Sequence, residues 1–163
     1  MKTLYLVRHA KSSWNIEGIT DIDRPLNDRG YKDAHDMAKR VNKKVHPGIL
    51  VSSPAIRAAS TALIFARHFD KSAAGIQLHP LLYDTNVKQY VQVISSLADE
   101  HATAFLFGHN PIITETANLL GGMHLIEMAT AGIVGIEFEV MTWKKVHGSL
   151  GRMILYDFPR NIS

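Results

Sequence analysis

The sequence predicts a three-layer α/β domain, in which helices cover both faces of a largely parallel central sheet. Short segments that are almost wholly apolar, such as residues 3–7 and 103–107, are typical of strands buried on both faces. Segments with helical periodicity separate them, and strands that alternate with helices indicate parallel pairing. The helical signal fades after residue 122, and residues 133–140 and 153–156 are expected to add antiparallel strands at one edge of the sheet.

The first helix is expected to begin at Asp28, where the spacing of the apolar residues changes to the helical period. Pro47 and Gly48 are expected to stop it before a second short buried strand at residues 49–51. Its expected buried face consists of Tyr31, Ala34, Met37, Ala38 and Val41, and its expected solvent face of Lys32, Asp33, Asp36, Lys39 and Arg40.

Three further helices are expected along the chain. Ser53 and Pro54 indicate a helix start, with a capping hydroxyl followed by proline at the first helical position. Pro111 is expected to begin the last helix, which Gly121 and Gly122 stop. The expected buried faces are Ile56, Ala59, Leu63 and Ala66, then Val87, Tyr90, Val91, Ile94 and Leu97, and finally Ile112, Ile113, Thr116, Leu119 and Leu120.

Length and composition are those of an ordinary globular domain. The chain has 163 residues, of which 46% are hydrophobic and 20% are charged, and this balance argues against a disordered chain. One domain over residues 1–163 is expected, because domains usually run to roughly 100–200 residues. The lack of cysteine excludes disulfide frameworks, thiolate metal sites and cysteine nucleophiles. No leader is recognisable at the N-terminus and no apolar run approaches the ~18 residues of a membrane span, so a cytoplasmic protein is expected.

The charge balance is mildly basic. The 18 Lys and Arg residues against 15 Asp and Glu residues give a formal net charge of +3. Nucleic-acid-binding proteins usually gather their bases on one face or along one helix. The longest basic runs here are two pairs, Lys43 with Lys44 and Lys144 with Lys145, which a solvated surface explains better. Neither nucleic acid nor a membrane is therefore an expected partner.

Side chains able to bind an anion follow three of the expected buried strands. Arg8 and His9 follow the first strand, Arg57 lies on the opening turn of the helix after the second, and His109 follows the strand at residues 103–107. In an open α/β sheet, ligands bind beyond the carboxyl ends of the strands. Helix N-termini favour anions, and guanidinium groups match phosphate oxygens. The set predicts an anion site, most simply a phosphate site, that contains imidazoles.

Each of these residues also has an ordinary structural explanation. A histidine at a strand end is more often a hydrogen-bonded structural residue than a catalyst, and Arg57 alone would most often be a surface charge. Their coincidence at three strand ends favours a functional site. The remaining histidines show no metal-ligand spacing, and core or surface roles are expected for His35, His46, His68, His79, His101, His124 and His147.

Four segments resemble the motifs of the histidine phosphatase superfamily, whose fold is also called phosphoglycerate mutase-like. Residues 6–15 (LVRHAKSSWN) resemble its signature, a strand running into Arg-His-Gly and a Ser/Thr-Trp-Asn turn. Residues 52–58 (SSPAIRA) and 108–111 (GHNP) resemble its second and third motifs, and residues 23–30 (DRPLNDRG) resemble the segment that opens its first helix. The matches keep the family's order and spacing between residue 4 and about residue 120.

The resemblance implies a role for each matched position. His9 matches the nucleophile that becomes transiently phosphorylated, and Arg8 and Arg57 match the phosphate clamp. His109 matches the second histidine of the pocket, and Asn15 matches a polar contact to the phosphoryl oxygens. His9 must attack as a neutral imidazole oriented by a backbone hydrogen bond, and the two arginines are expected to disfavour its protonation. No metal or cofactor is expected, because the arginines neutralise the phosphoryl charge.

Three nearby positions have less defined roles. Arg24 either reaches the mouth of the site and steers a phosphorylated partner, or pairs with Asp21 or Asp23 at the surface. Lys11 is either a useful positive charge beside the nucleophile or an exposed loop lysine. Ala10 stands where the family usually has glycine, and the loop is expected to accommodate its methyl group.

The stretch that corresponds to the family's general acid contains no glutamate. Many members that cleave phosphate esters protonate the leaving oxygen from a glutamate after the third strand, and residues 79–86 offer only Asp84, for which a solvated loop position is the alternative. A positioned general acid is typically worth 10²–10⁴-fold. Cleavage of phosphohistidine instead releases imidazole, a far better leaving group. Together with the short chain, this resembles the SixA-type phosphohistidine phosphatases, whose expected substrate is a phosphorylated protein and whose product is inorganic phosphate.

Three other functions stay open at this point. A small-molecule phosphomonoesterase or a mutase of the same fold would need a working acid, for which Asp84 is the candidate. A phosphate- or phosphoprotein-binding module without catalysis would bind its ligand stoichiometrically. A metal-binding histidine protein would be sensitive to chelators.

Overall fold

One six-stranded sheet forms the centre of the computed structural model, which describes residues 1–46, 48–148 and 150–161. The strands are β1 (Lys2–Arg8), β2 (Ile49–Ser52), β3 (Gln77–Leu78), β4 (Thr103–Gly108), β5 (Ile133–Phe138) and β6 (Arg152–Asp157). Their order across the sheet is β3-β2-β4-β1-β5-β6. The first four pair in parallel, whereas β5 runs antiparallel to β1 and β6 antiparallel to β5. The predicted parallel sheet with antiparallel strands at one edge is confirmed.

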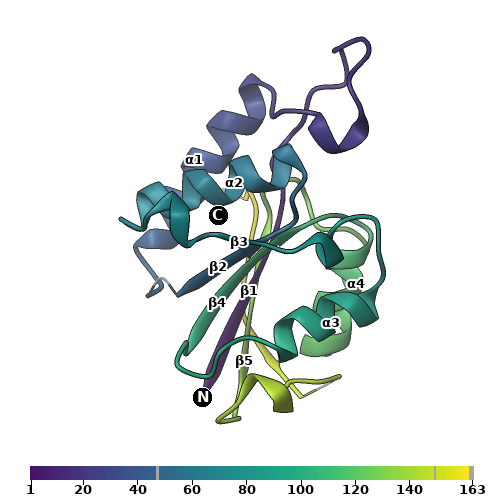
Figure 1. The fold of residues 1–163 in the computed structure, drawn as a ribbon. Helices are drawn as coiled ribbons and strands as arrows, with labels where there is room; N and C mark the ends of the chain where they lie inside the picture. The colour runs from purple at the N-terminus through teal and green to yellow at the C-terminus, as the bar shows by residue number, and fades with distance from the viewer. Residues whose placement is uncertain (47, 149, 162–163) are drawn as a thin grey trace.

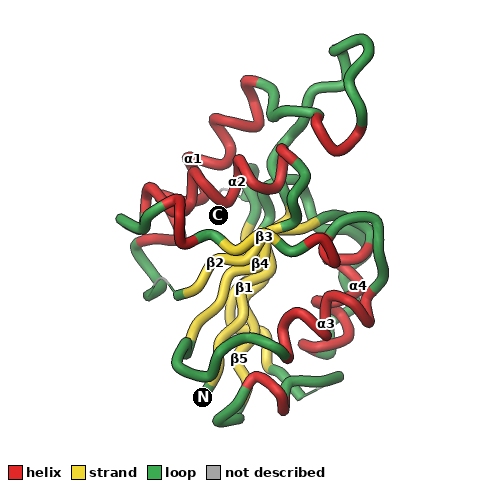
Figure 2. The backbone as a smooth tube through the Cα atoms, in the orientation of Figure 1, coloured by secondary structure: helices red, strands yellow, loops and turns green. Residues whose placement is uncertain are grey.

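Helices cover both faces of this sheet, as the three-layer prediction requires. Helices α1 (Asp28–Asn42) and α2 (Ile56–His68) lie on one face, and α3 (Val87–Ser95) and α4 (Ile112–Gly121) lie on the other (Figure 1). Figure 2 shows the strands running between the two helical layers. Among the described residues, no helix has both the length and the apolar character needed to cross a membrane. Short 3-10 turns complete the connections: η1 (Asp21–Asp23), η2 (Ala73–Gly75), η3 (Pro80–Leu82) and η4 (Trp143–Lys145).

The apolar composition of the central strands is explained by two hydrophobic cores, one on each side of the sheet. Successive side chains of a strand point to opposite faces. In β1, Leu4 and Leu6 pack into the core that includes α3 and α4, whereas Tyr5 and Val7 pack into the core that includes α1 and α2. Both faces of β1 are therefore buried, which is why its sequence shows no alternation of apolar and polar residues.

Helix α1 departs from the predicted pattern at two positions. Tyr31, expected in the core, is 45% exposed. Asp33, expected on the solvent face, is only 3% exposed, and its carboxylate accepts a hydrogen bond of 2.6 Å from Arg160. This partner from the C-terminal segment compensates the cost of burying the charge, and the pairing is not visible in the helical pattern. The helix ends at Asn42, and Pro47, the predicted stop, lies outside the described residues.

Helix α2 begins later than predicted, and a different face is buried. Ile56 is the first helical residue and is 42% exposed, while Ala55 is the N-cap residue and Pro54 lies before the helix. The hydroxyl of Ser53 accepts a hydrogen bond from the Ala55 N–H at 3.2 Å, so it stabilises the turn before the helix instead of capping it. The buried residues of α2 are Arg57, Ala58, Thr61, Ala62, Ile64, Phe65 and Ala66.

The second half of the chain follows the prediction more closely. Helix α4 has Pro111 as its N-cap residue and ends at Gly121, with Gly122 in the left-handed region at φ 63°. Glycine adopts this conformation without strain, which explains the predicted stop. The two-residue strand β3 was not predicted, because it is too short to show a pattern and both its residues are exposed at the sheet edge.

Candidate active site

The strand ends that the sequence singled out meet at one cavity of about 240 Å³. Strands β1, β2 and β4 end at Arg8, Ser52 and Gly108, and because they run in parallel their carboxyl ends lie at the same edge of the sheet. The four predicted catalytic residues and Arg24 are all among the residues that line this cavity, which are Arg8, His9, Lys11, Ser12, Trp14, Arg24, Arg57, His109, Asn110 and Thr130.

His9 is held at the cavity by its own loop. Its side chain is buried, and its Nδ1–H donates a hydrogen bond of 2.7 Å to the carbonyl of Ala10. Because a carbonyl can only accept, Nδ1 carries the proton and Nε2 keeps a lone pair, as a nucleophile requires. The Ala10 N–H in turn donates to the hydroxyl of Thr61 at 3.0 Å, which ties the loop to α2.

Ala10 fits the position where the family usually has glycine. It is fully buried, and the described non-glycine residues with positive φ are Asp70, Asp84 and Ala131, so Ala10 does not use the left-handed region. The expectation that the loop accommodates a methyl group is therefore confirmed.

Both histidines of the cavity are neutral at physiological pH. Burial lowers the pKa of His9 to about 3, and the neighbouring His109, Arg57 and Arg8 lower it as well, against the hydrogen bond to Ala10. Burial also lowers the pKa of His109 to about 4, with Arg57 as the next cause. The arginines do disfavour protonation as predicted, but removal from water is the larger effect.

We expect neither His9 nor His109 to become protonated above about pH 5, whereas exposed histidines protonate near pH 6.5. Imidazole ¹⁵N NMR between pH 8 and pH 4 measures this, and the His9→Ala protein assigns one of the two signals.

The pKa values of His9 and His109 are lower in the folded protein than in the unfolded chain, so the unfolded chain binds protons that the folded protein does not. The contribution of these two histidines to the free energy of unfolding is thus fully present above pH 6.5 and decreases as the pH falls towards about 4. In the NMR titration, a protonation midpoint of His9 near pH 6.5 would contradict the burial of its side chain.

Ser53 is the hydrogen-bond partner of His109 in the cavity. The Ser53 hydroxyl lies 2.8 Å from His109 Nε2 and accepts the Ala55 N–H at 3.2 Å, and we assign its own proton to the bond with Nε2. The ring proton of His109 then resides on Nδ1. The backbone N–H of His109 donates to the Tyr90 hydroxyl at 3.1 Å. A Cβ atom at Gly108 would lie 2.5 Å from that hydroxyl oxygen, so this close approach requires glycine.

Arg8 and Arg57, the predicted phosphate clamp, are both anchored by their terminal nitrogens. Arg8 Nη1 donates to the carbonyl of Met128 at 2.7 Å and lies 3.6 Å from the carboxylate of Glu127. Arg57 Nη1 donates to the carbonyl of Asp21 at 2.7 Å, and its Nη2 donates to the Asp21 carboxylate at 3.1 Å. The orientation of each guanidinium group is therefore fixed by the protein itself.

Three buried side-chain nitrogens in the described part of the chain lack a hydrogen-bond partner. They are Arg8 Nε, Arg57 Nε and His109 Nδ1, and all three belong to residues that line the same cavity. A buried donor without a partner costs about 1–3 kcal/mol, so such atoms are rare in folded proteins. Their concentration here indicates a site built for an acceptor-rich ligand.

Arg24 both lines the cavity and pairs with Asp21, the two placements that the sequence left open. Its Nε donates to the Asp21 carboxylate at 3.0 Å, yet the residue is only 8% exposed and lines the cavity. Its Nη1 donates to the Ser12 hydroxyl at 2.7 Å, and its guanidinium lies 3.5 Å from the centre of the Trp14 ring. The pairing with Asp21 is thus present, and it joins a buried arginine of the cavity to a half-exposed carboxylate beside it.

The other predicted residues lie at the margin. Asn15 is exposed, and it is not among the residues that line the cavity. Lys11 is exposed at the cavity rim. Asp84 lines a neighbouring hollow of about 480 Å³ together with His109 and Arg57. It is exposed and has a φ of 50°, a left-handed conformation that is uncommon for aspartate.

Two residues of the site were missed by sequence reasoning in their present roles. Asp21 was considered only as a surface partner, and Tyr83 was not singled out. The Tyr83 hydroxyl donates to the Asp21 carboxylate at 2.6 Å, and its ring forms a T-shaped pair with the His109 ring, with centroids 5.6 Å apart. Asp21 and Tyr83 are 62 positions apart, so no local pattern could have connected them.

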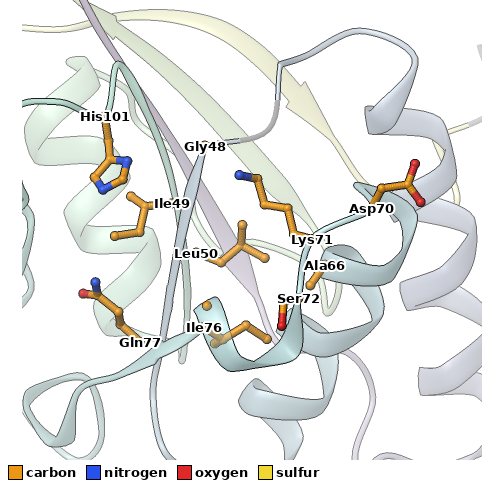
Figure 3. A pocket seen from close by; sticks show the side chains of 11 residues that line it. Gly48, Ile49, Leu50, Ala66, Asp70, Lys71, Ser72, Ile76, Gln77 and His101 are labelled. Carbon is orange, nitrogen blue, oxygen red and sulfur yellow. The ribbon is translucent and has the colours of Figure 1, made fainter.

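A second cavity, of about 450 Å³, lies at the opposite ends of the strands (Figure 3). Its walls come from the amino ends of β2 and β3, the segment after α2, and His101 before β4. None of the three buried unpartnered atoms of the described residues belongs to its lining. It therefore lacks the feature that marks the cavity around His9. No cluster of three or more potential metal ligands occurs within the described ranges.

A largely parallel sheet places two neutral histidines and three arginines in one cavity beyond its strand ends, an arrangement that suits an α/β enzyme acting on an anionic ligand. The chain belongs to the histidine phosphatase superfamily (branch 1), whose family model matches residues 4–106. The resemblance drawn from the four sequence motifs is confirmed.

Two proteins of one plant species are similar to this chain in sequence. An uncharacterized chloroplastic protein of Arabidopsis thaliana is 27% identical over 159 residues, which cover 92% of this chain and 72% of that protein. A metal-independent phosphoserine phosphatase of the same plant is 38% identical over 66 residues, covering 39% of this chain and 28% of that protein.

Solved structures match the fold over almost the whole chain. A SixA protein from Agrobacterium tumefaciens has a TM-score of 0.82 at 25% identity, covering 97% of this chain and 98% of that chain. The protein histidine phosphatase SixA in complex with tungstate also has a TM-score of 0.82, at 19% identity, and covers 99% of each chain.

Proposed function

We propose that this protein removes the phosphoryl group from phosphohistidine in proteins, through a phosphohistidine intermediate on His9. The observation that carries the proposal is the group of buried unpartnered nitrogens on Arg8, Arg57 and His109, which line one cavity with His9. A phosphoryl group offers the acceptor oxygens that these donors lack. We also propose that residues 1–163 act as one domain in the cytoplasm and that inorganic phosphate is the product.

In the first step, Nε2 of His9 attacks phosphorus in line with the bond to the leaving group. A P–N bond to His9 forms, and the electron pair of the breaking bond goes to the leaving imidazole, which takes a proton from solvent. Arg8, Arg57 and His109 bind the equatorial oxygens, where charge concentrates in phosphoryl transfer. Catalysis is then mainly positioning and electrostatic stabilisation by groups that are already oriented.

In the second step, water attacks the phosphorus of phosphorylated His9. The bond to Nε2 breaks, its electron pair returns to the imidazole, the attacking water gives up a proton to solvent, and inorganic phosphate leaves. Two successive half-reactions through one covalent intermediate give ping-pong kinetics. The three arginines that line the cavity supply the positive charge, so the proposal includes neither a metal nor a cofactor.

The surroundings of the cavity favour a protein-borne substrate. Hollows of about 480 and 500 Å³ adjoin it and share lining residues with it, the first Arg57, His109 and Asn110 and the second Arg8 and Asn110. Such flanking space suits a phosphorylated side chain on a partner surface. The similarity to structures of SixA proteins supports the same substrate class.

A phosphomonoesterase acting on a small molecule is the second candidate. Asp84 lines the hollow beside His109, where it could protonate a leaving alkoxide. The partial match to a metal-independent phosphoserine phosphatase also favours this candidate. A binding module without catalysis is a third, for which no turnover is expected.

Turnover on two substrates separates these candidates. We expect faster cleavage of a phosphohistidine-bearing protein than of para-nitrophenyl phosphate, and we expect Asp84→Asn to leave the phosphohistidine reaction unchanged. Cleavage of the bond to imidazole needs no strong acid, which is the reason for both expectations. Faster ester hydrolysis, reduced about 10²–10⁴-fold in Asp84→Asn, would establish the phosphomonoesterase instead. Stoichiometric binding of inorganic phosphate without turnover would establish the binding module.

A further inference from the structure

Asp21 connects three side chains of the site that come from different segments. It is the first residue of η1, and its carboxylate accepts hydrogen bonds from Arg57 on α2 at 3.1 Å and from Arg24 at 3.0 Å. A third hydrogen bond, of 2.6 Å, comes from the Tyr83 hydroxyl after η3. The backbone carbonyl of Asp21 also accepts from Arg57 at 2.7 Å, so both terminal nitrogens of that guanidinium are bound to one residue.

The carboxylate of Asp21 stays ionised throughout the physiological pH range. The hydrogen bond from Tyr83, followed by those from Arg57 and Arg24, lowers the pKa of Asp21 to about 2, although partial burial acts in the opposite direction. A permanent negative charge thus lies beside a cavity lined by Arg8, Arg24 and Arg57. A carboxylate in this place opposes anion binding, so its presence requires an explanation other than ligand affinity.

We infer that Asp21 is the positioning residue of the phosphate clamp, and that its negative charge limits how tightly the site retains free phosphate. This inference rests on the proposed function. Asp21 holds the terminal nitrogens of Arg57, and the Nε atom of the same group is left without a partner. Asp21 acts through the arginines and does not line the cavity of His9 itself.

The two effects of Asp21 oppose each other in the catalytic cycle. A fixed guanidinium group stabilises the transition state without reorganisation, which raises the rate of the chemical step. Nearby negative charge weakens the binding of the phosphate dianion, which helps product release. Removing the charge is therefore expected to slow turnover while strengthening phosphate binding. A loss of folding would instead lower both the turnover rate and the affinity for phosphate.

The test compares Asp21→Asn with Asp23→Asn. Asp23 lies in the same turn, and its carboxylate accepts a hydrogen bond from Thr20 at 2.9 Å, outside the cluster of arginines. In Asp21→Asn the side-chain amide presents a donor where one carboxylate oxygen accepted, so either Arg57 or Arg24 loses its hydrogen bond to the side chain of residue 21, while the backbone carbonyl still holds Arg57. We expect kcat on a phosphohistidine-bearing protein to fall by about 10–100-fold in Asp21→Asn, because small misplacements of catalytic groups have effects of this size.

Calorimetric titration with inorganic phosphate provides the second readout. We expect Asp21→Asn to bind phosphate several-fold more tightly than the wild type, with KM changing less than kcat, and Asp23→Asn to match the wild type in both assays. Tyr83→Phe removes one hydrogen bond and keeps the carboxylate, so a smaller fall in kcat with unchanged phosphate affinity is expected.

Two results would overturn the inference: wild-type kcat in Asp21→Asn, or phosphate binding that is lost together with turnover while the thermal melting curve stays that of the wild type. If Asp21→Asn does not fold, the Tyr83→Phe protein decides, since a wild-type kcat there would also overturn the inference. A wild type that turns over neither substrate refutes the proposed function, and the phosphate titration still tests Asp21 in that case.

Discussion

His9→Ala is expected to abolish turnover, with a loss on the order of 10⁶-fold, the scale typical of removing a covalent nucleophile. His9 has one free ring nitrogen, is kept neutral by burial, and lies in the cavity with the three unpartnered donors. The remaining cavity residues offer no second imidazole in this position, because Nε2 of His109 is hydrogen-bonded to Ser53. Steady-state turnover on the phosphohistidine-bearing protein measures the effect.

A matched control and a direct readout make this test specific. His35→Ala removes an exposed imidazole on α1 and is expected to retain wild-type turnover. Mass spectrometry after an alkaline quench is expected to detect a phosphorylated enzyme in the wild type and in His35→Ala, and none in His9→Ala. A phosphorylated, active His9→Ala protein would refute the proposed nucleophile.

Arg57→Ala is expected to lower kcat by about 10²–10³-fold, the usual effect of removing one preorganised group that stabilises transition-state charge. Arg57 is 6% exposed, and two of its nitrogens are fixed by Asp21. Its contribution therefore involves no reorganisation during the reaction. Arg57→Lys is expected to rescue little, because an ammonium cannot reproduce the planar guanidinium that Asp21 holds.

Separate measurement of kcat and KM decides how Arg57 acts. Arg67 lies on the last turn of the same helix and is exposed, so Arg67→Ala is a control that is expected to keep both constants. A rise in KM alone in Arg57→Ala would mean that Arg57 binds substrate and transition state equally, and would contradict its proposed role in catalysis.

The strands were predictable because each central strand is buried on both faces. Leu4 and Leu6 on one side and Tyr5 and Val7 on the other make β1 a continuous apolar run. The helices were predictable in number, but their buried faces were less so. In α1, Asp33 is buried because Arg160 meets it, and periodicity alone cannot anticipate a partner 127 residues away.

The predicted catalytic set was recoverable from the sequence because of the parallel sheet. Arg8, His9 and His109 directly follow strands, and Arg57 opens the next helix, so one topological rule brings them together. No comparable rule places Asp21 and Tyr83, which lie in loops. Ser53 shows the same limit, because its serine-proline pattern indicated a helix cap while its hydroxyl bonds His109.

The sequence by itself determined the α/β class, the parallel strands with their antiparallel edge, and the gathering of two histidines and two arginines at one sheet edge. These properties follow from local apolar patterns and from chain order, which a single sequence contains. Only the tertiary structure decided that Arg24 is buried, that Ser53 bonds His109, and that Asp21 holds the guanidinium group of Arg57. Each of these depends on hydrogen bonds between segments far apart in the chain, whose geometry is set by packing and has no local signal.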